Sequence, residues 1–329
     1  MRLLLTNDDG IEAAGLHALR DALLRIPGLE VMVVAPDGNR SATGRSITTR
    51  RPIVSRHVTF ADGGVGWAID GTPVDCVRLG WHELAGGKPD LIVAGINHGA
   101  NLGDDITYSG TAGAALEGHH LGLPGLAVSQ VARDAGLGFT DEGGYDFRAV
   151  AAFAAQLVAK AQDVGLVKGT VLNVNAPAGD PSHAELTRLG RRVYKDGLRR
   201  LEGEAPERAA RHGAAEPVVT YGNAERISIY GVTATHDEEP GTDLYAVARG
   251  HISVTPVTLR WTDLARIEEL HTPSIDAALV DSGAHIVSDE EAALEAHGRT
   301  SPAGPLVQSA APVDVEDLTH AAESPSAAE

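Results

Sequence analysis

The stretch RLLLTNDDG at residues 2–10 joins an apolar run to a polar turn that contains two adjacent carboxylates. Its leucines are continuous rather than alternating with polar residues, a pattern typical of a strand with both faces buried. Strands of this kind occur in parallel sheets that helices cover on both sides. The stretch therefore predicts an α/β fold in which residues 2–6 form the first strand and Asp8 and Asp9 follow its carboxyl end.

The rest of the first 180 residues alternates short apolar runs with helical patterns, as expected for βαβ units around a parallel sheet. Thr72 and Pro73 are residue types preferred at the cap and at the first position of a helix. Further strands are expected at 30–35, 91–95, 126–129 and 171–174, extended segments at 51–59 and 66–70, and helices at about 12–25, 73–84, 111–120 and 145–162.

The pattern changes at about residue 186. From there the sequence predicts antiparallel hairpins, forming a flap or a dimerisation element, with strands at 193–194, 218–221, 227–230 and 251–256. Beyond about residue 271 the chain is rich in Ala, Ser, Pro and acid, with eleven Asp or Glu against one Arg. We expect a domain at 1–262 (core about 1–180, extension about 186–262) and a disordered acidic tail at 271–329.

The composition limits the classes of function. Hydrophobic residues make up 43% of the 329, enough for a core, and the formal charge of -18 argues against binding nucleic-acid polymers. Cys76 is the single cysteine, so no intrachain disulfide can form. The N-terminus lacks a signal-peptide pattern, and no apolar run approaches the roughly 20 residues of a membrane span. A cytoplasmic protein without membrane association is the expectation.

The adjacent carboxylates Asp8 and Asp9 indicate a metal site. They repel each other, and a divalent cation relieves that repulsion while taking hard oxygen ligands. The alternative is a helix cap together with a charge favoured by the helix dipole.

Two later loops also follow predicted strands. Residues 36–46 combine hydroxyls and glycines with Arg40 and Arg45, which suit phosphate binding, although a solvated surface loop has a similar composition. After the strand at 91–95, Asn97 offers a neutral oxygen to a metal. Ser109-Gly110-Thr111 then lies where a helix begins and could bind an anion, or could simply cap and pack that helix. Because these loops all follow strand ends, they are expected at one edge of the sheet.

Several other sites are disfavoured. No GxGxxG follows the first strand, and the chain has no P-loop, no GxSxG elbow and no zinc-type spacing. His98 lies near the proposed site but is interpreted as a packing or surface residue rather than a base. Cys76 is interpreted as a core residue.

The chain resembles the SurE family of stationary-phase survival proteins, which are 5′/3′-nucleotidases, over roughly residues 1–260. The matching motifs are TNDDG, APDGNRSATGRSIT, DGTPVDCVRLG, PDLIVAGINHGANLGDDITYSGTAGAALEG, LNVNAP and TDLYAVARGHISVTP. The resemblance implies a Rossmann-like, mostly parallel sheet with helices on both faces. It also implies a C-terminal extension that is exchanged between the subunits of a homodimer or homotetramer.

The resemblance further implies one divalent ion per subunit, Mg²⁺ or Mn²⁺, with Asp8, Asp9, Ser41 and Asn97 as ligands. One position departs from the family pattern, because Ala42 stands where the family usually has glycine after the serine. If that position needs a positive φ, the alanine would shift the loop.

The resulting hypothesis is a 5′-nucleotidase, a metal-dependent phosphomonoesterase that hydrolyses nucleoside monophosphates. A metal-activated water would attack phosphorus in line, with Asp8 and Asp9 as the catalytic carboxylates. The phosphate-binding candidates are Asn101, Ser109, Gly110 and Thr111.

Two other functions remain open. A phosphatase with an aspartyl-phosphate intermediate also uses an Asp after the first strand, although usually with DxD spacing rather than adjacent aspartates. A non-catalytic nucleotide- or metal-binding regulator would need the same ligands without hydrolysis.

Overall fold

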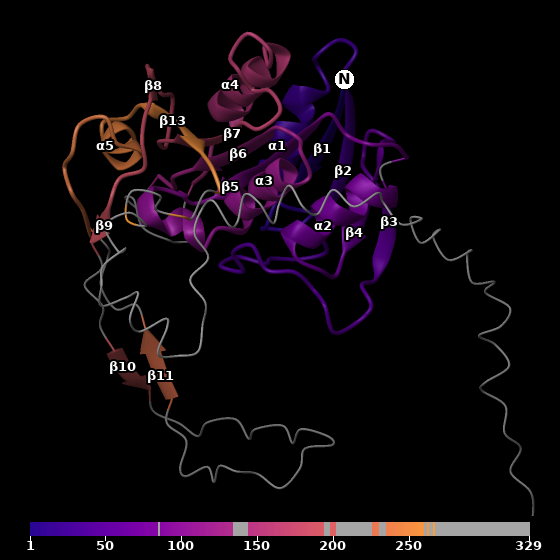
Figure 1. Cartoon of the computed structure of the whole chain (residues 1–329), viewed down its shortest axis with the longest axis horizontal. Helices are drawn as coiled ribbons and strands as arrows, with labels where there is room; N and C mark the ends of the chain where they lie inside the picture. The colour runs from indigo at the N-terminus through magenta and orange to yellow at the C-terminus, as the bar shows by residue number, and fades with distance from the viewer. Residues whose placement is uncertain are drawn as a thin grey trace, which may run out of the picture. The chain divides into compact units, whose positions relative to one another are not determined.

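The computed structural model describes residues 1–84, 86–133, 144–193, 198–201, 226–229, 235–259, 262 and 266. Nine of the described strands form one sheet in the order β3-β4-β2-β1-β5-β6-β7-β13-β8 (Figure 1). Six neighbouring strands of this sheet, from β4 to β7, are parallel. The nine strands are β1 (Arg2–Thr6), β2 (Glu30–Pro36), β3 (Ser55–Thr59), β4 (Val65–Ile69), β5 (Leu91–His98), β6 (Gly125–Gln130), β7 (Val171–Ala176), β8 (Ala184–Leu186) and β13 (Ile252–Val257).

The leucines of β1 explain its central place. Leu3 and Leu5 pack into one core cluster and Leu4 into another, and all three are fully buried. A strand with two apolar faces needs helices on both sides. The helices α1 (Ala14–Leu23) and α4 (Arg148–Ala159) contribute to the first cluster, whereas α2 (Pro73–Leu79) and α3 (Gly110–His120) contribute to the second (Figure 1). The predicted α/β sheet with helices on both faces is confirmed.

The chain changes direction across the sheet at β1. From β1 it passes to β2 and β4 on one side, and it then returns to β5 on the other side of β1. In open α/β sheets, ligands bind at the carboxyl ends of the strands at such a switch point. Asp8 and Asp9 follow β1, and Asn97 lies near the end of β5, so the topology brings these residues together.

Helix α2 begins as predicted. Thr72 accepts a hydrogen bond from the Asp75 amide, and Asp75 accepts one from the Thr72 amide, which makes a capping box with Pro73 at the first helical position. The helix continues into a π-helical turn, Gly80–Leu84.

Among the boundaries that differ from prediction, two concern the carboxyl edge of the sheet. Strand β5 continues beyond residue 95 to His98, because Asn97 and His98 still pair with β6 after a shift in register. Helix α4 begins at Arg148 rather than at 145, so Tyr145 and Phe147 precede the helix. Both changes place side chains near the carboxyl edge of the sheet.

The segment predicted as a hairpin strand at 251–256 belongs to the main sheet instead. Strand β13 pairs antiparallel with β7 and parallel with β8. The preceding helix, α5 (Asp243–Ala248), packs against β13 and β7. The prediction was wrong because an apolar alternating strand looks the same in a hairpin and inside a larger sheet; only its partners distinguish them.

Short antiparallel pairs do occur in the later region. They are β9 (Arg192–Val193) with β12 (Thr235–His236), and β10 (Leu198–Leu201) with β11 (Arg226–Ile229). The predicted strand at 218–221 and the acidic tail at 271–329 lie outside the described residues. Among the described helices, none is long and apolar enough to cross a membrane.

Candidate active site

Two carboxylates are buried side by side after β1. Asp8 is 3% exposed and the Asp9 side chain 4%. Burial, and then the charge of Asp9, raise the pKa of Asp8 from 3.8 to about 6. Keeping both carboxylates ionised in this place is costly without a cation, which makes the pair suited to a divalent ion.

The first turn of α3 holds Asp8. The Thr111 hydroxyl donates to Asp8 Oδ1 at 2.5 Å, and the Thr111 amide donates to Asp8 Oδ2 at 3.1 Å. A Cβ atom on Gly110 would lie 2.8 Å from Asp8 Oδ2, so this glycine is required by the carboxylate next to it. Ser109 caps the helix, its side chain accepting from the Ala112 amide at 3.0 Å. The helix N-terminus therefore fixes the position of Asp8. The two hydrogen bonds to the Asp8 carboxylate both come from Thr111, not from the Gly110 amide.

The end of β5 holds Asp9. The His98 amide donates to Asp9 Oδ2 at 3.0 Å. The preceding residue, Asn97, donates from its side-chain nitrogen to the Gly99 carbonyl at 2.9 Å. This bond fixes the amide plane of Asn97 and turns its oxygen away from Gly99. Asn97 and Asp9 are thus carried to the same edge by adjacent strands.

The loop after β2 is fastened to this edge at several points. The Arg40 amide donates to the Asp8 carbonyl at 2.6 Å, and the Gly44 amide donates to the Tyr108 carbonyl at 3.0 Å. Arg45 pairs with Glu117 of α3 at 2.6 Å. Ser41 lies between these attachments and is exposed, with its amide bonded to the Asn39 side chain at 2.7 Å. The structure therefore brings the loop that carries Ser41 against Asp8.

Ala42, which stands where glycine is usual, has a backbone conformation that favours glycine. Its φ is 57°, in the left-handed region, and it is the only non-glycine residue with positive φ in the described part of the chain. The Cβ atom of an L-residue is crowded in this conformation, at a cost of about 1 kcal/mol relative to glycine. The loop keeps the backbone shape that favours glycine although it carries alanine.

Asn101 belongs to a buried polar network. Its side-chain nitrogen donates to the Ser129 hydroxyl at 2.8 Å, and its amide donates to Asn175 Oδ1 at 2.7 Å. Its carbonyl accepts from the side chains of Asn173 and Asn175 at 2.8 and 3.0 Å. These contacts attach the loop after β5 to the ends of β6 and β7. A phosphate contact from Asn101 stays a prediction.

The sequence analysis did not identify several residues whose ion pairs hold the loops around the site in place. The buried carboxylate of Glu117 contacts both Arg45 and Arg78, the latter at 2.8 Å. The signal was present, since Glu117 is the one acidic residue in the small-residue helix GTAGAALEG. The short turn η2 (Gly103–Thr107) is held by Arg192, which pairs with Asp105.

Asp243 is a further residue that the sequence analysis did not identify. It lies in α5 and accepts from the amides of Gly103 and Gly190 at 2.8 Å. Burial raises its pKa although these amides stabilise the charged form. No local pattern predicts either this contact or that of Arg192, because the partners are far apart in the chain.

The predicted ligands suit a hard cation. Asp8 and Asp9 supply charge, while Asn97 and Ser41 supply neutral oxygens. Within the described residues, no group of three or more His, Cys, Asp or Glu side chains is arranged to hold a metal. A metal at this edge would therefore need the amide and hydroxyl oxygens in addition to the two carboxylates.

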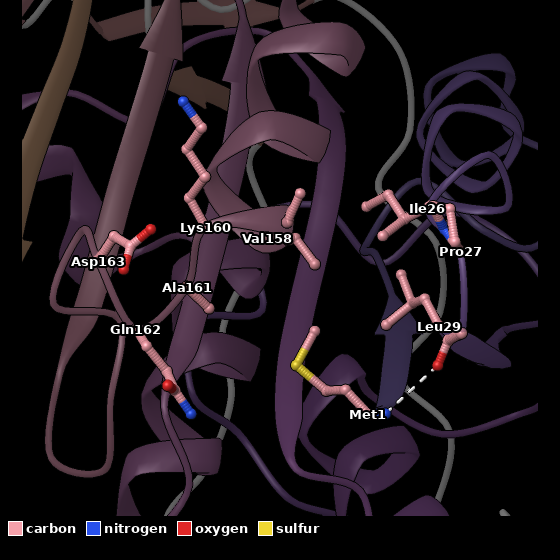
Figure 2. Close-up of a pocket in the computed structure, with 11 residues that line it drawn as sticks. Met1, Ile26, Pro27, Leu29, Val158, Lys160, Ala161, Gln162 and Asp163 are labelled. Carbon is pink, nitrogen blue, oxygen red and sulfur yellow. Dashed lines mark hydrogen bonds between the residues drawn. The ribbon is translucent and has the colours of Figure 1, made fainter.

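Asp8 and Asp9 line neither of two pockets found in the described part of the chain. A hollow of about 400 Å³ lies at the opposite edge of the sheet, between Met1, Ile26 and the end of α4 at Val158 (Figure 2). A second, of about 310 Å³, is lined by residues such as Val131 and Pro177, which follow β6 and β7. The second hollow shares the carboxyl edge with the candidate site.

Comparisons with known proteins agree on one family. The family model described as "Survival protein SurE" matches residues 3–196. A curated 5′-nucleotidase SurE from Rubrobacter xylanophilus is 45% identical over 85% of this chain and 100% of its own length. A 5′-nucleotidase SurE 1 from Thermus thermophilus is 41% identical over 82% of this chain and 96% of its own length. The crystal structure of the SurE protein from Aquifex aeolicus has a TM-score of 0.62 and 34% identity, covering 82% of this chain and 98% of that one.

Proposed function

Because this chain belongs to the SurE family, we propose that it is a 5′-nucleotidase, which hydrolyses nucleoside monophosphates to nucleoside and phosphate with the help of a divalent ion. The observation that supports this most directly is the buried pair Asp8 and Asp9 at the topological switch point, against the first turn of α3. A pair of charges of this kind is costly to the fold and is explained by a bound cation.

Asp8, Asp9, Ser41 and Asn97 would hold one ion, either Mg²⁺ or Mn²⁺. Such an ion, when bound, supplies positive charge for the phosphoryl oxygens and lowers the pKa of coordinated water. The chain's own residues fix the geometry. Thr111 orients both oxygens of Asp8, and the His98 amide orients Asp9.

The phosphate would bind at the first turn of α3, where Ser109 and Gly110 begin the helix. Amides at a helix N-terminus favour anions. The Thr111 side chain donates to Asp8, so it contributes by placing the carboxylate, and Gly110 lies directly against the same carboxylate. Asn101 is proposed to contribute from the loop after β5.

Phosphate release tests this function. Adenosine 5′-monophosphate and its 3′ isomer would be assayed with Mg²⁺, with Mn²⁺ and with chelator, using the wild type and Asp9→Asn. We expect metal-dependent release by the wild type and loss of turnover in the variant, which should remain folded. Near-normal turnover of Asp9→Asn would refute the assignment, and a trapped phosphoenzyme would point to the aspartyl-phosphate mechanism instead.

The assembly and its location are also proposals. We propose a homodimer or homotetramer in the cytoplasm, with no nucleic-acid polymer or membrane as partner. The single, buried cysteine is compatible with a reducing compartment. Light scattering on the full chain gives the number of subunits, and a monomer at micromolar concentration would refute the oligomer.

A further inference from the structure

Three aromatic rings form a compact cluster next to Asp9, in which each ring contacts the other two. The ring centroids of His98 and Tyr145 are 5.0 Å apart, those of His98 and Phe147 5.1 Å, and those of Tyr145 and Phe147 5.2 Å. The ring planes differ by only 8° to 25°. These separations are typical of offset stacking. Phe, Trp and Tyr make up only 4% of the chain, so rings placed together at this edge need an explanation.

The ring cluster is buried at Phe147 and partly exposed at His98 and Tyr145. Phe147 is 7% exposed and belongs to the core under α4. The side chain of His98 is 25% exposed, and Tyr145 is partly exposed. Core packing explains Phe147 and contributes to the position of Tyr145, which packs against the same core, but it does not explain the ring of His98, which lies nearly parallel to both and reaches the surface.

The partly exposed side of the ring cluster, at His98, is adjacent to the proposed metal ligands. His98 directly follows Asn97, its amide donates to Asp9, and its ring Nδ1 lies 3.9 Å from Asp9 Oδ2. In a nucleoside monophosphate, one ribose separates the phosphate from the base. A phosphate held at the carboxylates would therefore place the base within reach of the neighbouring rings.

We propose that Tyr145 and His98 stack with the nucleobase of the substrate. This inference rests on the proposed nucleotidase function. Every base has a π face, so stacking on aromatic side chains distinguishes nucleotides from other phosphomonoesters without selecting one base. The site would accept nucleoside monophosphates with different bases and would disfavour sugar phosphates that lack a base.

Tyr145→Ala tests the proposal, because it removes one ring of the cluster and keeps the backbone amide of His98 that donates to Asp9. Steady-state kinetics with adenosine 5′-monophosphate and ribose 5-phosphate would be measured with the same metal. We expect the ratio of kcat/KM for the nucleotide to that for the sugar phosphate to fall about tenfold, mainly through KM. Tyr145→Leu, which keeps bulk without a flat ring, should give the same fall.

Two controls separate stacking from packing. Tyr145→Phe retains the ring and should keep the wild-type ratio. Ala248→Trp narrows the second hollow at the ends of β6 and β7 and should also leave the ratio unchanged. Equal losses on both substrates in Tyr145→Ala and Tyr145→Leu would overturn the proposal, as would a selective loss in Ala248→Trp. If the wild type hydrolyses neither substrate, the proposed function itself fails; an unchanged ratio in an active enzyme overturns only the stacking.

Discussion

Replacing Arg192 by methionine should destabilise the protein strongly, because it leaves a buried charge without its partner. The side chains of Arg192 and Asp105 are 1% and 0% exposed, and Arg192 Nε donates to Asp105 Oδ2 at 2.7 Å. Breaking a buried pair from one side typically costs about 3–5 kcal/mol. Methionine keeps the apolar stem of the arginine, so the loss is mainly that of the charge.

The companion variant removes the carboxylate charge as well. In Asp105→Asn/Arg192→Met no unpaired ion remains, and the neutral amide has a much smaller cost of burial. We expect the double variant to be more stable than Arg192→Met by about 2 kcal/mol or more, a coupling that a double-mutant cycle measures directly. Urea unfolding followed by circular dichroism, at constant metal concentration, gives the free energies.

The pH dependence of stability is an independent check on the predicted destabilisation of Arg192→Met. Burial is the largest influence on Asp105 and raises its pKa even beside Arg192. Without Arg192 the folded state should favour the protonated carboxyl still more, so it binds more protons than the unfolded state. The loss in free energy of unfolding of Arg192→Met, relative to the wild type, should therefore be largest near neutral pH and become smaller as the pH falls. A variant as stable as the wild type at pH 7, or a loss that grows in acid, would refute the reasoning.

Three further changes address the site itself. Gly110→Ala puts a Cβ 2.8 Å from Asp8 Oδ2, and the displaced carboxylate should lower kcat by about 100-fold while circular dichroism stays native. Ala42→Gly relieves the left-handed backbone and should raise the free energy of unfolding in urea by up to about 1 kcal/mol; a loss would mean that the loop is not strained. Glu117→Gln weakens the hold on Arg45, so the metal concentration for half-maximal activity should rise, and an unchanged value would show that this tether does not position the serine loop.

The local parts of the fold follow from short stretches of sequence. The continuous leucines of β1 predict a strand with two buried faces, and Leu3 and Leu4 do enter different core clusters. Thr72 and Pro73 predict the start of α2 because capping depends on residues within one turn. Ser109 caps α3 for the same reason.

The predictions that failed depend on distant partners. The segment at 251–256 has the same alternation in a hairpin as inside a larger sheet, and only its pairing with β7 and β8 decides between them. Helix α4 was placed too early because Tyr145 and Phe147 fit a helical apolar pattern, whereas in the fold they stack with His98.

The sequence by itself determined which strands the functional residues follow. It placed Asp8, Asp9 and Asn97 at strand ends, and it predicted the helix that begins after Asn97. Periodicity and capping are set by neighbours in the chain, so a linear reading is enough for these. Only the tertiary structure decided what Thr111 contacts, since its hydroxyl and amide bind the Asp8 carboxylate, 103 residues away in the chain. The anchoring of the Gly103 amide by Asp243, 140 residues later, was likewise decided by the fold, because such contacts depend on which surfaces the packed sheet brings together.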